Sequence, residues 1–380
     1  MNASDLDFTH LVQANRRFAL DLYERLSRQE GSLFFSPYSL SAALAMTYAG
    51  ARGETQRQMV KTLHFTAQAE LIHASFKALA ESVRQAAQSQ GISLRLANSL
   101  WPQVQHPFRE DFLALLGNAY AAQAEAVDYI GDYEDARKRI NAWVEAQTGG
   151  MIPELLTQGI LDDLTRLTLV NAIYFKGLWA HPFDPANTSE VPFWLTPRES
   201  VPAQMMHQTR SLRYAEADGN QLVELPYAGE RLAMVALLPQ KADRLDDMER
   251  RLPDRLERWL ASLAPRQVSL ALPRFRLDCA FRLDEALQSL GMKDAFSEHK
   301  ANFAGMDGHA DWLYIAAVVH QAVIEVNEQG SEAAAATAVV LAQRAMPQMP
   351  VEVRLDRPFL MLIWDKETQS ILFLGRVNKP

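Results

Sequence analysis

Residues 328–350 read Glu328-Gln-Gly-Ser-Glu-Ala-Ala-Ala-Ala-Thr-Ala-Val-Val-Leu-Ala-Gln-Arg-Ala-Met-Pro-Gln-Met-Pro350. An apolar run typical of a strand, Ala316 to Val326, precedes this stretch, and a second run, Val351 to Leu355, follows it. The connection is long for a compact domain, and connections of this length are usually functional or disordered. What this stretch can do is therefore the first question that the sequence poses.

Residues 328–350 could adopt either of two conformations. Alanine is the best helix former, which favours a surface helix over residues 332–342. As a strand, the stretch would carry no charge on one of its two faces and no proline before Arg344, and such a segment could slot into the middle of a sheet. Both readings stay open, and they could hold at different times. The strand would present small and then larger side chains on one face: Ser331, Ala333, Ala335, Thr337, Val339 and Leu341.

The rest of the chain changes character along its length. The first third reads as helices, including an N-terminal one carrying Phe8 to Leu26 and one from Pro37 to Gly50, and a further helix is expected over Ala136 to Ala146. From about residue 166, apolar and β-branched runs predict strands. This order indicates an α+β fold rather than a regular βαβ alternation. No shift in composition marks a boundary, so we expect one domain over residues 1–380. The strand-like runs cover residues 167–175, 232–239, 268–273, 316–326 and 359–364.

Composition excludes several classes of partner. The chain has 380 residues, of which 48% are hydrophobic, and a net charge of -8, which argues against nucleic acid or an anionic membrane as a partner. No apolar run approaches the ~20 residues needed to span a bilayer. Cys279 is the single cysteine, so no internal disulfide can form. The N-terminus lacks a basic stretch followed by an apolar run, so we expect no intact signal peptide; localisation stays open, with a secreted or cell-surface place favoured.

Enzyme motifs are missing from the sequence. It contains no phosphate-binding glycine loop, dinucleotide fingerprint, paired zinc-binding histidines or nucleophile elbow. The nine histidines are scattered without metal-ligand spacing. We therefore predict a protein that is not an enzyme and that needs no cofactor and no metal.

Many short motifs are spread along the chain. One is the stretch Glu328-Gln-Gly330-Ser-Glu332-Ala-Ala-Ala-Ala-Thr337. The others are Phe35-Ser-Pro-Tyr-Ser39, Met46-Thr-Tyr-Ala-Gly-Ala-Arg-Gly-Glu-Thr55, Asn98-Ser-Leu-Trp101, Ile140-Asn-Ala-Trp-Val-Glu145, Asn171-Ala-Ile-Tyr-Phe-Lys-Gly-Leu-Trp179, Leu225-Pro-Tyr227, Leu272-Pro-Arg-Phe275 and Arg357-Pro-Phe359. Taken together in their order, these motifs resemble those of the serpins, and the match runs through essentially the whole length. The stretch from Glu328 to Thr337 is similar to the hinge of inhibitory members.

The resemblance implies a fold of three β-sheets and about nine helices, with an exposed reactive loop over residues 328–350. It also implies a suicide mechanism, in which a protease cleaves the loop and the freed hinge inserts into the large sheet, trapping the acyl-enzyme. Counting along the loop places the reactive bond between Arg344 and Ala345, with Gln343 or Met346 as alternatives because extra residues precede Phe359. The implied hinge residues are Glu328, Gly330, Ser331, Glu332, Ala333, Ala334, Ala335, Ala336 and Thr337.

A bait arginine suits the carboxylate-bearing pocket of a trypsin-like serine protease, which is the partner that we expect, through a covalent acyl complex. We expect a monomer. A non-inhibitory serpin that acts as a binding, chaperone or storage protein is the alternative, and the alanine-rich hinge argues against it. Residues 67–90 carry only Lys77 and Arg84 as basic side chains, so no heparin dependence is expected.

Two groups of structural residues are carried over from the family. Ser36, Asn171 and His320 correspond to a polar cluster beneath the opening of the large sheet. Trp179, Arg274 and Glu328 correspond to the place where the loop first enters, and an Arg274–Glu328 ion pair is expected there. For Trp179, plain core packing stays open as an alternative to a gating role.

Overall fold

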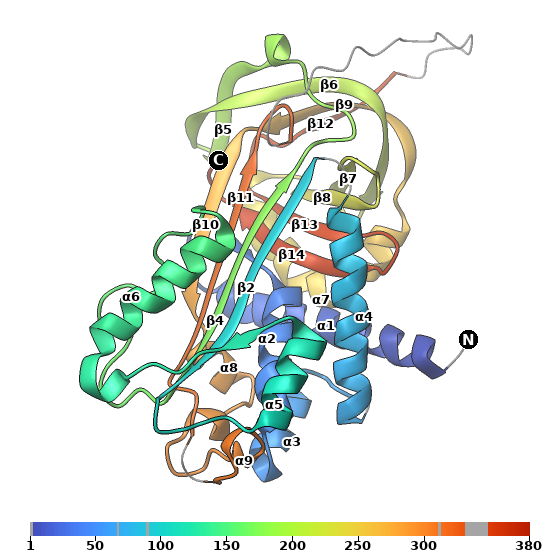
Figure 1. The fold of residues 1–380 in the computed structure, drawn as a ribbon. Helices are drawn as coiled ribbons and strands as arrows, with labels where there is room; N and C mark the ends of the chain where they lie inside the picture. Colours follow the sequence, from blue (N-terminus) through green and yellow to red (C-terminus); the bar gives the residue numbers. More distant parts are fainter. Residues whose placement is uncertain (1–2, 67, 89–90, 311–312, 331–348) are drawn as a thin grey trace.

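The structure is a computed structural model that describes residues 3–66, 68–88, 91–310, 313–330 and 349–380. Within these ranges the chain forms helices α1 to α9 and strands β1 to β14 (Figure 1). The helices are α1 (Ala3–Leu26), α2 (Pro37–Gly50), α3 (Gly53–Thr62), α4 (Ala69–Ala87), α5 (Glu110–Leu115), α6 (Tyr129–Thr148), α7 (Leu245–Ala261), α8 (Asp284–Ser289) and α9 (Ala304–Asp307). The strands are β1 (Leu33–Phe35), β2 (Ile92–Pro102), β3 (Gln123–Ala124), β4 (Leu167–Gly177), β5 (Ser189–Thr196), β6 (Glu199–Ala217), β7 (Asn220–Pro226), β8 (Leu232–Pro239), β9 (Ala264–Pro273), β10 (Phe275–Arg282), β11 (Ala317–Val326), β12 (Val351–Arg354), β13 (Phe359–Asp365) and β14 (Ser370–Val377).

A five-stranded sheet lies at the centre of the fold, with strand order β10-β11-β4-β2-β3. Strand β11 runs antiparallel to β10 but parallel to β4, and β4 runs antiparallel to β2. The parallel pair β4–β11 is therefore flanked by antiparallel neighbours. In its register, His320 of β11 lies opposite Asn171 of β4.

Both faces of this sheet are covered, which explains why its central strands read as continuous apolar runs. Alternate residues of β4 point to opposite sides. Val170, Ala172 and Tyr174 pack in the core beneath α6, whereas Leu169 and Ile173 pack in the main core together with α2. Figure 1 shows α6 beside the sheet, running in roughly the same direction as β4 and β2.

The remaining strands pair in the order β1-β14-β13-β8-β7-β6-β9-β12, with β5 added to β6. Two of the three expected sheets are thus joined by one long strand. The first residues of β6, Glu199–Met205, pair with β5, and its last residues, Arg213–Ala217, pair with β7. Strand β6 continues from one layer into the next, so the backbone hydrogen bonds are unbroken between them. The α+β class is confirmed.

Helix α2 lies inside the protein and positions the cluster described below. Its first residue is Pro37, which suits the first turn because proline lacks the N–H that would be unpaired there. Ser36 caps the helix, and its Oγ accepts a hydrogen bond from Ser39 N at 3.1 Å. Thirteen of its fourteen residues are buried, so the helix is enclosed by the protein around its whole circumference.

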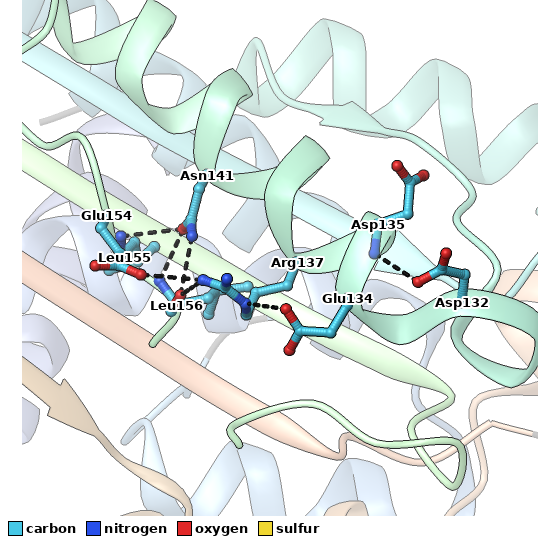
Figure 2. Close-up of polar contacts among 8 residues, drawn as sticks. All are labelled: Asp132, Glu134, Asp135, Arg137, Asn141, Glu154, Leu155 and Leu156. Atoms are coloured by element: carbon cyan, nitrogen blue, oxygen red, sulfur yellow. Dashed lines mark hydrogen bonds and ion pairs between the residues drawn. The ribbon is translucent and has the colours of Figure 1, made fainter. Parts of the chain in front are cut away.

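Helix α6 is tied to the segment that follows it by buried polar groups (Figure 2). Arg137 is 7% exposed; it donates to Glu134 Oε2, to Glu154 Oε1 and to the Leu156 carbonyl at 2.9–3.0 Å. Asn141 Nδ2 donates to Leu156 O at 2.9 Å, and its Oδ1 accepts from Leu156 N at 2.8 Å. These contacts fix the helix to the segment that follows it.

Candidate functional site: the sheet beneath the loop

The chain leaves β11 through a turn that is held by side chains from three other segments. Glu328 is 4% exposed, and its Oε1 accepts from Arg274 Nε at 2.6 Å and from Thr188 Oγ1 at 2.5 Å. Burial raises the pKa of the Glu328 carboxyl, but these two hydrogen bonds outweigh it and hold the pKa below its ordinary value. The expected Arg274–Glu328 ion pair is present.

Gly330 is required at this turn for steric reasons. Its φ is +97°, and Gly330 N donates to Asn327 O at 3.1 Å, closing the turn. A Cβ at this position would lie 2.1 Å from Gly177 O and 2.5 Å from Trp179 N. The start of the loop is therefore pressed against the end of β4, in reach of the boundary between β4 and β11.

Trp179 fastens the same turn from the side of β4. Its backbone N–H donates to Gln329 O at 3.0 Å, and its indole Nε1 donates to Asn327 O at 2.9 Å. The indole stacks on Tyr227 with ring centroids 4.7 Å apart. Trp179 thus packs in the core and also holds the turn.

Deeper in the same sheet, a side-chain bridge connects β4 to β11. His320 Nδ1 and Asn171 Oδ1 lie 2.5 Å apart, and both side chains are fully buried. His320 Nε2 accepts from Ser36 N at 3.1 Å, which places the imidazole proton on Nδ1 as the donor to Asn171. Burial lowers the pKa of His320 to about 3, so the ring is neutral.

Ser36 and Asn171 extend this bridge into a network. Ser36 Oγ donates to Leu372 O of β14 at 2.7 Å. Asn171 Nδ2 donates to Ser39 Oγ at 2.6 Å and also to Asn98 Oδ1 of β2. The network therefore connects α2, β2, β4, β11 and β14 in a region where polar groups are otherwise scarce.

The structure thus brings Ser36, Asn171 and His320 together, and separately Trp179, Arg274, Glu328 and Gly330. The predicted reactive bond Arg344–Ala345 and the hinge residues Ser331, Glu332, Ala333, Ala334, Ala335, Ala336 and Thr337 lie outside the described residues. Sequence analysis missed Ser39, Asn98 and Thr188 as members of these networks. A polar residue among apolar neighbours, as at Asn98, is the sequence feature that could have identified such a member.

Two negative findings concern the described residues alone. They include no helix that is both long and apolar enough to cross a bilayer. Within the same part of the chain, no group of three or more histidine, cysteine or acidic side chains is placed to hold a metal ion.

Comparison with known proteins agrees with this architecture. The leukocyte elastase inhibitor of Bos taurus is 42% identical over 381 residues, covering 97% of this chain and 99% of that protein. Serpin48, a highly specific serpin of the insect Tenebrio molitor, has a solved structure with a TM-score of 0.89 at 30% identity, covering all of both chains. Human thyroxine-binding globulin, solved in complex with thyroxine, gives a TM-score of 0.88 at 29% identity and covers 98% of this chain and 99% of that one. The family model described as Serpin (serine protease inhibitor) matches residues 13–380, and the chain therefore belongs to the serpin family of serine protease inhibitors.

Proposed function

We propose that this chain, acting as one monomeric domain over residues 1–380, is a single-use inhibitor of trypsin-like serine proteases. The protease serine would attack the carbonyl carbon of Arg344, break the bond to Ala345 and release a new amino terminus there, leaving an ester between Arg344 and the enzyme. The freed segment after Gly330 would then enter the central sheet before water can cleave the ester.

The observation that supports this proposal best is the position of the loop's first residues over the β4–β11 boundary. The chain turns back at Gly330 beside the end of β4, so a strand continuing from there would run antiparallel to β11. Because β4 is parallel to β11, that strand would be antiparallel to both neighbours. Insertion would replace one parallel pairing by two antiparallel ones, and antiparallel pairing is slightly more stable per residue.

The His320–Asn171 bridge marks what must change on insertion. Its 2.5 Å contact spans the boundary that the new strand would occupy, so the bridge has to open. A buried polar contact that is broken and not replaced would cost about 1–3 kcal/mol. We infer that this network helps to keep the sheet closed until cleavage.

The bait residue supports trypsin-like proteases as targets. An arginine pairs with the carboxylate at the base of a trypsin pocket, whereas an elastase pocket is small. The bovine relative is named as an elastase inhibitor, and an elastase would favour a small residue such as Ala342 or Ala345 as the bait. The position of the cleaved bond separates these possibilities.

The test is incubation with trypsin, followed by denaturing electrophoresis and sequencing of the released fragment. We expect a detergent-stable band at the summed mass and a new N-terminus at Ala345. Arg344→Ala should abolish rapid inhibition of trypsin and leave the fold intact. Cleavage without a stable complex would contradict inhibition, and a new N-terminus elsewhere would contradict the bait assignment.

A binding function without inhibition is the second candidate, because the relative solved with thyroxine has the same fold. The alanine-rich hinge argues against it. Complete cleavage by every serine protease tried, with no covalent complex, would favour it.

A further inference from the structure

A cavity of about 640 Å³ lies between α4, β2 and the helical turn η1 (Leu116–Tyr120). Its volume falls in the range of small-molecule sites. Most of its wall is apolar. Phe76 and Val83 of α4 and Leu94 and Leu96 of β2 line it, together with Ala42 of the buried helix α2.

Two sets of polar side chains in the wall differ in whether they have partners. The first set already has partners: Arg84 is paired with Glu81 at 2.6 Å, Tyr120 OH contacts His73 Nδ1 at 2.6 Å, and Asn98 belongs to the network around Asn171. These groups complete contacts within the protein.

The second set is Lys77 and Tyr38. Among the described residues, the exposed Lys77 ammonium has no carboxylate within ion-pair distance, and the Tyr38 hydroxyl has no hydrogen-bond partner. Tyr38 is 5% exposed as a whole residue, and its side chain lines the cavity. A cation at the solvent end and a donor at the buried end therefore border the same apolar space.

We propose that this cavity binds an elongated apolar monocarboxylate, with the carboxylate at Lys77, the hydrocarbon body along α4 and β2, and an acceptor oxygen near Tyr38. An ammonium favours an anionic head because a charge-assisted hydrogen bond is stronger than a neutral one. The tyrosine hydroxyl favours a ligand that carries a carbonyl or ether oxygen in its tail. Neither group is part of the proposed inhibitory mechanism, so this site stands independently of it.

The test is titration calorimetry of the full chain with three probes of equal length: dodecanoate, a keto-dodecanoate and dodecanol, each below its micelle-forming concentration. We expect the keto acid to bind more tightly than dodecanoate and dodecanol to bind most weakly, with a negative heat-capacity change from burial of the chain. Lys77→Gln should weaken both acids about tenfold and leave dodecanol unchanged. Lys61→Gln, an exposed lysine of α3, is the matched control and should change nothing.

Two further variants locate the ligand. Tyr38→Phe should remove the preference for the keto acid over dodecanoate, without weakening dodecanoate itself. Ala80→Trp should fill the space beside Lys77 and abolish binding of all three probes; should it fail to fold, the Lys77 and Tyr38 variants decide. Equal affinity for acid and alcohol, or affinities that none of these cavity variants alters, would overturn the proposal. Protease inhibition plays no part in these readouts, so failure here leaves the proposed function untouched.

Discussion

His320 is a neutral histidine between two parallel strands, and its lowered pKa makes the stability of the folded protein depend on pH. Its pKa is about 3 in the folded protein, against about 6.5 for an unperturbed histidine. Between these two values the unfolded chain binds a proton that the folded protein does not. The free energy of unfolding therefore falls as the pH drops from about 6.5 towards 3, and the stabilisation is complete only above that window.

We expect His320→Gln to flatten this dependence, which amounts to several kcal/mol over the window. Unfolding rates of the parent and the variant, measured between about pH 4 and pH 7, provide the check. His73, whose pKa burial lowers to about 4, acts in the same direction, so His73→Gln should remove a separate part of the slope. The exposed His299 is the matched control. Identical slopes for the parent and His320→Gln would show that the imidazole of His320 does not titrate in this way.

At the scale of the element, α6 and the segment that follows it pack on one face of the central sheet. Asn141 supplies one donor and one acceptor to the backbone of Leu155 and Leu156. Asn141→Ala would leave the buried N–H groups of Leu155 and Leu156 without partners, at about 1–3 kcal/mol for each group that cannot rearrange, whereas the Leu156 carbonyl keeps its hydrogen bond from Arg137. We expect faster unfolding by urea and an apparent loss of about 2–4 kcal/mol.

Lys138→Ala is the matched control on the exposed side of α6 and should change stability by less than about 0.5 kcal/mol. The measurement is the rate of unfolding, because the proposed mechanism implies a kinetically trapped fold, for which an equilibrium midpoint is not well defined. Equal unfolding rates for the two variants would mean that the hydrogen bonds of Asn141 do not stabilise the packing of α6 and its following segment.

The elements also show where sequence reasoning succeeds. The bounds of α2 and β8 agree with the predicted Pro37–Gly50 and Leu232–Pro239, because a proline and a glycine delimit the first and an unbroken apolar run forms the second. Strand β2 was not predicted, since the first third of the chain was assigned to helices. Several of its residues are only partly buried, so it lacks the continuous apolar pattern of a central strand.

Strand β6 and one member of the polar network, Asn98, were missed for a related reason. Pro202, Gln204 and Gln208 interrupt the apolar pattern of β6, whose strand is defined by its pairing with β5 and β9. The family resemblance identified Asn171 and His320 but not Asn98. Asn98 lies directly opposite Asn171 in the β2–β4 register, and that register is known only once the strands are paired.

At the scale of the whole molecule, the proposed mechanism requires that the intact fold store free energy that cleavage releases. We expect complete cleavage after Arg344 to raise the apparent melting temperature by about 10 °C or more. The reason is that the inserted strand would add a row of backbone hydrogen bonds, each contributing ~1 kcal/mol, and bury Val339 and Leu341. Scanning calorimetry of intact and cleaved protein is the measurement. Ordinary nicking of a surface loop would leave the melting temperature unchanged or lower it.

Substitutions in the hinge test whether that rise comes from insertion in the register proposed. Strand alternation would turn Ser331 inward and Glu332 towards solvent, so Ser331→Arg would bring an unpaired charge beneath the sheet. Each 1.4 kcal/mol added to the insertion barrier slows insertion about tenfold, which gives water time to hydrolyse the acyl bond. Ser331→Arg should therefore be cleaved by trypsin at Arg344 yet form little stable complex and gain less stability on cleavage. Glu332→Arg is the matched control with the same new side chain, and it should inhibit and gain stability nearly as the parent does. If the two variants behave alike, the hinge does not insert in this register, and the assignment of inward-facing residues from Ser331 onward is wrong.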